Sequence, residues 1–174
     1  MSLVEFNGKK PLLGKRVYVD PTATLIGDIV VGEGVGIWPG AIIRGDEGKV
    51  ILEEGVMVLE NAIIEAGKGG VLTIKNGTII SHGAIVHGAS IGSKCVIGIG
   101  AKVLDNAIVH DHSLIGSGAL VAPNKEIPSK KVVLGIPGKI TKDLDDADLA
   151  NSRKEWDMLN NKLDYYIQIR GVKY

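Results

Sequence analysis

Residues 89–121 read ASIGSKCVIGIGAKVLDNAIVHDHSLIGSGALV, and every sixth residue from Ile91 onward is a β-branched apolar one. A small residue stands two positions before each of them. The two sets are Ile91, Ile97, Val103, Val109, Ile115 and Val121, and Ala89, Cys95, Ala101, Ala107, Ser113 and Ala119. A period of six fits neither an amphipathic helix nor a hairpin meander. It is typical of a parallel β-helix, in which three short strands complete one coil.

The same register extends toward the N-terminus with short interruptions. Three extra residues lie near Glu47–Lys49, four lie near Lys68–Val71, and a five-residue step precedes Ile91. The upstream members are Leu25, Val31, Ile37, Ile43, Leu52, Val58, Ile64, Ile74, Ile80 and Val86. The repeat therefore covers about residues 12–137 and predicts about seven coils, with the branched side chains pointing inward.

Glycine-containing pairs are expected to form the turns between strands, for example Gly27-Asp28, Gly92-Ser93 and Gly116-Ser117. The alternative fold is an ordinary β-sandwich, whose turns recur about every 8–12 residues and whose strands alternate apolar and polar residues. Uninterrupted steps of six favour the β-helix.

The pattern changes after Gly135-Ile136-Pro137-Gly138. A single helix is predicted over residues 143–169, because Trp156, Leu159, Leu163 and Tyr166 recur at helical spacing. Acidic residues gather where its N-terminus would lie, and Gly171 would end it. We expect residues 1–140 to form the β-helix domain and residues 141–174 to form a helical segment packed on it, rather than a dimerising coiled coil.

Composition narrows the classes of function. Twenty basic and twenty acidic residues cancel, so the 174-residue chain has no electrostatic footprint for nucleic acid or an anionic membrane. The single cysteine, Cys95, cannot form an intramolecular disulfide and suits a reducing cytosol. There is no apolar signal core in Met1–Gly8 and no apolar run long enough to span a membrane. We therefore expect a cytoplasmic protein without nucleic-acid or membrane partners.

Counting coils brings three polar residues together. Arg44, Glu65 and His87 each follow an apolar repeat residue directly, and they are separated by one coil plus the local insertion. They should lie in one column on one face, about 4.8 Å apart. Glu60 and His82 should lie on the preceding face in the same way.

His82 and His87 are five residues apart, and imidazole is a common metal ligand. Side chains on two different faces meet only across a contact between subunits. A threefold assembly would bring His82 of one chain to Glu65 and His87 of another. Two histidines and a carboxylate form a recognised zinc site with an open position for water. The alternative is that the two histidines are incidental surface residues.

These residues resemble the γ-class carbonic anhydrases and their hexapeptide-repeat relatives, including proteins labelled ferripyochelin-binding. The resemblance spans nearly the whole chain and includes Arg44-Gly45-Asp46, His82-Gly83-Ala84-x-x-His87-Gly88 and Gly135-x-Pro137-x-Lys139. It implies a left-handed β-helix and a homotrimer with three zinc sites at its subunit interfaces, where Fe2+ or Co2+ can replace Zn2+. It also implies that His82 and His87 are metal ligands, and that Arg44 and Asp46 tie subunits together and shape the active site.

The chain departs from this family at several positions. Glu65 stands where the family has its third histidine. The family's Asn-x-Gln-Asp stretch falls on Met57-Val58-Leu59-Glu60, so Met57 and Leu59 cannot orient hydroxide and substrate as the Asn and Gln are thought to do. Trp156 falls where relatives often carry a tyrosine.

Three functions are considered. The first is a metal-dependent lyase that hydrates CO2 reversibly through a metal-bound water, with Glu65 as the third ligand. The second is a trimeric relative that has lost this activity and serves as a binding or structural protein. The third is an acyltransferase. Two features argue against it: the insertions are short, and no histidine has an acid–base partner that can be recognised from the sequence.

The sequence favours a metal-binding, carbonic-anhydrase-like trimer acting on CO2 and bicarbonate. The catalytic candidates are Arg44, Asp46 and Glu60, and the metal ligands are Glu65, His82 and His87. His110-Asp111-His112 is interpreted as a solvated turn, and Cys95 as an inert core residue.

Overall fold

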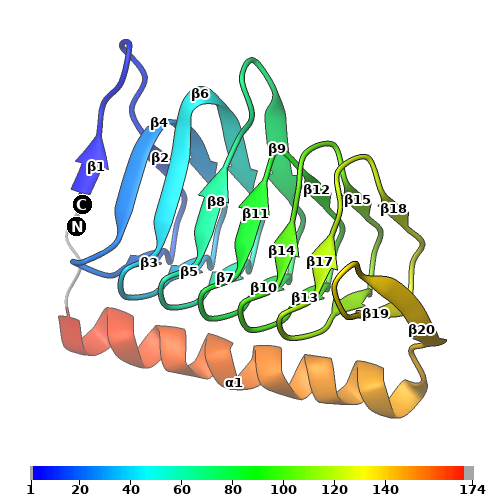
Figure 1. The fold of residues 1–174 in the computed structure, drawn as a ribbon. Coiled ribbons are helices and arrows are strands. Elements are labelled where there is room, and N and C mark those ends of the chain that lie inside the picture. Colours follow the sequence, from blue (N-terminus) through cyan, green and yellow to red (C-terminus); the bar gives the residue numbers. More distant parts are fainter. Residues whose placement is uncertain (1, 171–174) are drawn as a thin grey trace.

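The computed structural model describes residues 2–170 and shows a stack of parallel coils with one long helix along its side (Figure 1). The predicted left-handed parallel β-helix of hexapeptide repeats with a C-terminal helix is confirmed. The strands are β1 (Ser2–Val4), β2 (Leu12–Leu13), β3 (Tyr18–Val19), β4 (Thr24–Val31), β5 (Gly36–Ile37), β6 (Ile42–Leu52), β7 (Met57–Val58), β8 (Ile63–Glu65), β9 (Val71–Ile74), β10 (Ile79–Ile80), β11 (Ile85–His87), β12 (Ser90–Ile91), β13 (Val96–Ile97), β14 (Lys102–Val103), β15 (Ile108–Val109), β16 (Leu114–Ile115), β17 (Leu120–Val121), β18 (Glu126–Ile127), β19 (Lys131–Leu134) and β20 (Lys139–Asp143). The helix α1 spans Asp146–Arg170.

Three faces surround the core. The helix face, on which α1 lies, contains β3, β5, β7, β10, β13 and β16. The site face contains β8, β11, β14 and β17 with the first halves of β4 and β6. The third face contains β2, β9, β12, β15 and β18, together with the second halves of β4 and β6. Because β4 and β6 pass from one face to the next without interruption, the site and third faces form one sheet.

The interior is built from the predicted repeat residues. All sixteen of them, from Leu25 to Val121, are at most 2 % exposed. The small residues before them are equally buried, including Cys95 and Ser113. A prism this narrow accepts one branched side chain per strand, with a small one where the backbone turns. The period of six is therefore the packing period of the core.

One predicted turn is wrong. Gly27-Asp28 lies inside β4, where the chain bends from the site face to the third face. The positive φ of Gly27, +84°, produces this bend, and a Cβ there would lie only 2.5 Å from the carbonyl oxygen of Gly45. Glycine is needed at this position because two backbones approach closely, not because the chain reverses.

Helix α1 begins later than predicted, because residues 139–143 form β20. This strand pairs antiparallel with β19 at the end of the stack. Asp145 then caps the helix, since its Oδ1 accepts a hydrogen bond from the backbone N–H of Asp148 at 2.8 Å. Gly171, the predicted stop, lies outside the described residues, and the division at residue 140 stays a prediction.

The helix packs on its face of the prism as its spacing predicts. Leu159 and Leu163 are buried, and Trp156 and Tyr166 pack beside them. Their partners on the prism are Tyr18, Trp38, Met57, Leu59, Ile79 and Val96. These outward-facing side chains form a second core between α1 and the helix face, separate from the interior of the prism.

Candidate metal centre

The predicted column of polar side chains is present on the site face. Backbone pairing aligns Arg44 with Glu65 and Glu65 with His87. Arg44 Nη1 lies 3.0 Å from Glu65 Oε1, and Glu65 Oε2 lies 3.9 Å from Nε2 of His87. Arg44 therefore holds one oxygen of Glu65, while the other oxygen faces the imidazole.

The other ring nitrogen of His87, Nδ1, contacts a second carboxylate. Nδ1 of His87 lies 2.9 Å from Oδ1 of Asp105, which is 18 residues further along the chain. The sequence prediction missed Asp105, because the five-residue step before Ile91 puts Leu104, and not Asp105, in register with His87. This contact fixes the imidazole ring and leaves Nε2 turned toward Glu65.

His82 is held in the same manner. Its Nδ1 lies 2.7 Å from Oε2 of Glu60, in the turns that lead from the helix face to the site face. This Glu60 oxygen is buried and, within residues 2–170, has no hydrogen bond of good geometry, although the imidazole nitrogen lies close to it. The side chain of His82 is 52 % exposed. Its Nδ1 is engaged while most of the ring remains accessible from outside the chain.

Arg44 pairs with Asp46 of its own chain. Two guanidinium nitrogens, Nε and Nη2, donate to the two carboxylate oxygens of Asp46 at 3.2 and 2.8 Å. The hydrogen bonds from Arg44 lower the pKa of Asp46 below its ordinary value, and the same contact raises the pKa of Arg44. Arg44 thus bridges two carboxylates, Asp46 and Glu65, and both groups of the ion pair stay charged at neutral pH.

Met57 and Leu59 take no part in this column. Met57 is fully buried and Leu59 is 3 % exposed, and both pack beneath α1 in the second core. Trp156 is also committed to packing, since its Nε1 donates to the carbonyl oxygen of Gly55 at 2.7 Å. The polar residues that the family would place here are replaced by residues that fasten the helix to the prism.

No single chain completes a metal site. Among residues 2–170, no three His, Cys, Asp or Glu side chains lie close enough together to hold a metal ion. Glu65 and His87 supply two donors from one chain, and any third donor has to come from elsewhere. The donor set nevertheless suits a divalent metal, because both imidazoles have Nδ1 directed at a carboxylate. That arrangement is typical of metal-binding histidines.

The remaining candidates have ordinary roles. Nε2 of His110 lies 2.7 Å from Oε1 of Glu126, so this histidine does have a carboxylate partner that the sequence prediction did not find. His112 occupies a turn position with a φ of +59°. Cys95 is buried, and burial raises the pKa of its thiol to about 12, which agrees with an inert core residue.

Comparison with known proteins places this fold in a family. The family described as Bacterial transferase hexapeptide (six repeats) matches residues 88–123. Gamma carbonic anhydrase 2, mitochondrial, of Arabidopsis thaliana is 33 % identical over 155 residues, which cover 86 % of this chain and 56 % of that protein. The chain thus spans little more than half the length of this relative.

Two further relatives match over more of their length. The carnitine operon protein CaiE of Salmonella agona is 30 % identical over 162 residues, which cover 93 % of this chain and 79 % of CaiE. A crystal structure of a hexapeptide transferase family protein from Anaplasma phagocytophilum superposes with a TM-score of 0.90 at 25 % identity, covering 95 % of this chain and 98 % of that one.

The fold defines a hexapeptide-repeat β-helix protein. Within that class, the chain belongs to the γ-carbonic-anhydrase-like family, as the resemblance of its motifs implied. Among the described helices, none is both long and apolar enough to cross a membrane.

Proposed function

We propose that this protein is a trimeric, metal-binding member of the γ-carbonic-anhydrase-like family with reversible CO2 hydration as its reaction. A divalent metal, zinc in the first instance, would be held by Glu65 and His87 of one subunit and His82 of the next. The observation that carries this proposal is the pair of imidazoles whose Nδ1 atoms face Asp105 and Glu60. Such outer carboxylates fix the tautomer of a ligand and raise its basicity.

The site face supports the trimer. Ile42, Ile63 and Ile85 stand in register two positions before Arg44, Glu65 and His87, and strand alternation turns them outward as well. Ile42 is 37 % exposed, and the other two are partly exposed. An apolar stripe beside a column of histidine and carboxylate is a surface that a second subunit would cover. The same contact would bring a neighbouring His82 to the column.

The chain's own residues have defined tasks in the proposed reaction. Arg44 positions Glu65 by holding one of its oxygens, and its positive charge would attract the bicarbonate product. Glu60 and Asp105 hold the two imidazoles in orientation. A bound divalent metal would act as a Lewis acid and lower the pKa of water to near neutrality.

A second candidate is a binding protein without turnover. It is favoured by the burial of Met57 and Leu59 beneath α1, because neither can orient a reacting water or CO2. The chain could therefore bind a metal without catalysing CO2 hydration. Acyl transfer, the third function considered from the sequence, loses one of the objections to it, because His87 does have a carboxylate partner, Asp105.

The test combines metal analysis with a CO2 hydration assay on anaerobically purified protein. We expect about one metal ion per chain, since each of three interfaces would contain one site. His82→Ala should lose the metal, whereas His110→Ala should keep it, because His110 pairs with Glu126 outside the column. Absence of metal from the wild type contradicts the proposal. Full metal content without CO2 hydration activity would favour the second candidate, a binding protein without turnover.

A further inference from the structure

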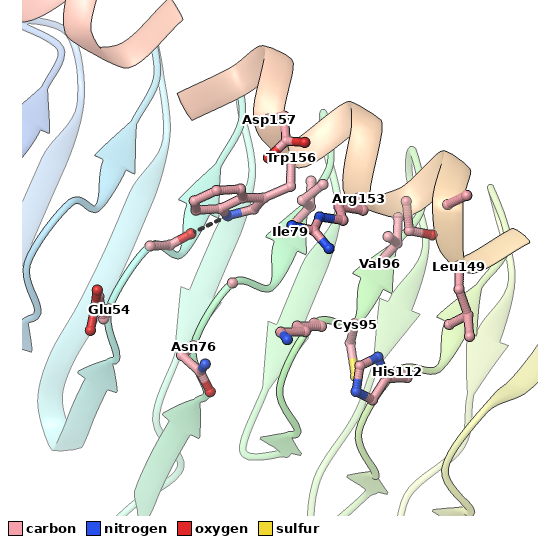
Figure 2. Close-up of a pocket in the computed structure, with 15 residues that line it drawn as sticks. Glu54, Asn76, Ile79, Cys95, Val96, His112, Leu149, Arg153, Trp156 and Asp157 are labelled. Atoms are coloured by element: carbon pink, nitrogen blue, oxygen red, sulfur yellow. Dashed lines mark hydrogen bonds between the residues drawn. The ribbon is translucent and has the colours of Figure 1, made fainter. Parts of the chain in front are cut away.

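A groove separates the first half of α1 from the turns at one edge of the helix face (Figure 2). Its volume is about 650 Å³, within the range of small-molecule sites. It lies on a different face from the Arg44–Glu65–His87 column and shares no residue with it. Whatever occupies the groove is therefore a separate ligand from the proposed metal.

The groove exists because both of its walls include glycine or other small residues. Gly55 and Gly77 occupy successive left-handed turn positions, with φ of +68° and +66°. Trp156 lies across Gly55, where a Cβ would come within 2.9 Å of its ring, and this contact sets the distance of the helix from the prism. On the N-terminal side of Trp156, α1 presents Ala150 and Ser152, which are too small to fill the gap.

Basic side chains line the groove between Glu54 at one end and His112 at the other. The two turn positions that follow Gly77 carry Lys94 and His112, and Arg153 of α1 faces them from the other wall (Figure 2). Over the described part of the chain, neither Arg153 nor Lys94 forms an ion pair. Two carboxylates, those of Glu54 and Asp157, also line the groove. Glu54 lies at the end remote from His112 (Figure 2).

The floor between the walls is apolar. Ile79 and Val96 belong to the helix face and are buried, and Leu149 of α1 closes the groove above His112. An apolar floor with unpaired cations beside it matches a ligand that has a hydrocarbon body and one anionic group. A carboxylate would accept charge-assisted hydrogen bonds from a guanidinium and an ammonium group.

We propose that this groove binds a small aliphatic carboxylic acid. Its carboxylate lies between Arg153 and Lys94, and its hydrocarbon chain covers Ile79 and Val96. The proposal does not depend on the metal site or on the trimer.

Isothermal titration with octanoate tests this assignment. The His82→Ala variant serves as the background, because a bound metal would also attract a carboxylate. We expect saturable binding of one octanoate per chain. Arg153→Gln should weaken it about tenfold, through loss of a charge-assisted hydrogen bond. Lys154→Gln is the matched control, because Lys154 is an exposed neighbour on α1 that does not line the groove, and it should leave the affinity unchanged.

The apolar part is tested separately. Ala150 is exposed on α1 and lines the groove, so Ala150→Trp should fill the space without disturbing the core and should abolish binding. Octylamine should bind at least tenfold more weakly than octanoate, because its charge is repelled by Arg153 and Lys94. Three results would each overturn the proposal. They are no saturable octanoate binding, equal affinity for octylamine, and unchanged affinity in both Arg153→Gln and Ala150→Trp.

Discussion

Oδ1 of Asp105 lies 2.9 Å from Nδ1 of His87, one coil further along the chain. Oε2 of Glu60, which lies one coil before His82, is 2.7 Å from Nδ1 of that histidine. Each imidazole is thus held at Nδ1 by a carboxylate supplied by a neighbouring coil. Stacking in register places Glu60 beside His82, and it places Asp105 one position past the residue aligned with His87, because Val86 pairs with Val103.

Asp105→Ala should weaken zinc binding about 10- to 100-fold, because His87 would lose the group that fixes its tautomer and orientation. Equilibrium dialysis against a zinc indicator measures the change. Glu126→Ala is the matched control, since it removes the carboxylate of the His110 pair outside the column. Equal losses in the two variants would show that Asp105 has no special role at the site.

Glu65→Ala should lower metal occupancy sharply if Glu65 is a ligand. Glu65→His should keep or raise zinc affinity, because it supplies a third imidazole. Hydration activity need not rise with it, since Met57 and Leu59 remain packed beneath α1. Metal analysis of the three proteins after identical purification checks these expectations. Equal metal content in the wild type and Glu65→Ala would show that the ligand assignment is wrong.

Ile63→Glu should convert the proposed trimer to monomer, because it places charge in the middle of the outward stripe formed with Ile42 and Ile85. Sedimentation velocity at micromolar concentration measures the species present. Ile108→Glu, an exposed isoleucine on the third face, should remain trimeric. A wild-type protein that sediments as a stable monomer would exclude an interfacial metal site.

Val103→Asp should prevent folding, because Val103 is fully buried inside the prism and the carboxylate would have no partner there. The cost of several kcal/mol is a large part of a total stability of about 5–15 kcal/mol. Lys102→Asp changes the adjacent, exposed residue and should fold normally. Circular dichroism and thermal unfolding distinguish the two. A cooperative transition near the wild-type temperature in Val103→Asp would contradict the assigned register.

The Arg44–Asp46 ion pair should make stability sensitive to acid. Because Arg44 lowers the pKa of Asp46 in the folded state, the unfolded chain binds more protons in acid. The stabilisation is fully present above the unfolded pKa of about 3.9 and is lost as the pH falls through the lower, folded pKa. With Arg44 36 % exposed, solvent screening should limit the contribution to about 0.5 kcal/mol.

Urea unfolding between about pH 7 and about pH 3 measures this effect. Asp46→Asn should be less stable than the wild type at neutral pH, and the difference should shrink in acid. Parallel stability profiles of the two proteins across this range would show that Asp46 does not contribute through its charge.

The sequence by itself determined the β-helix, the inward residues and the polar column. Ile97 and Val103 recur at the packing period of the prism, and a parallel stack repeats its geometry with every coil. Counting 18 residues and adding the insertions was therefore enough to align Arg44, Glu65 and His87. The helical stripe from Trp156 to Tyr166 was readable for a similar reason, since one face of a helix has to be apolar to pack.

Only the tertiary structure decided what these side chains contact. Whether Glu65 turns toward Arg44 or His87 depends on rotamers and on charges from neighbouring coils, which no spacing specifies. The burial of Met57 and Leu59, and the groove beside Trp156, depend on where α1 docks. That docking arises from contacts between residues about 100 positions apart, such as Trp156 with Gly55, and local sequence periodicity does not encode such contacts.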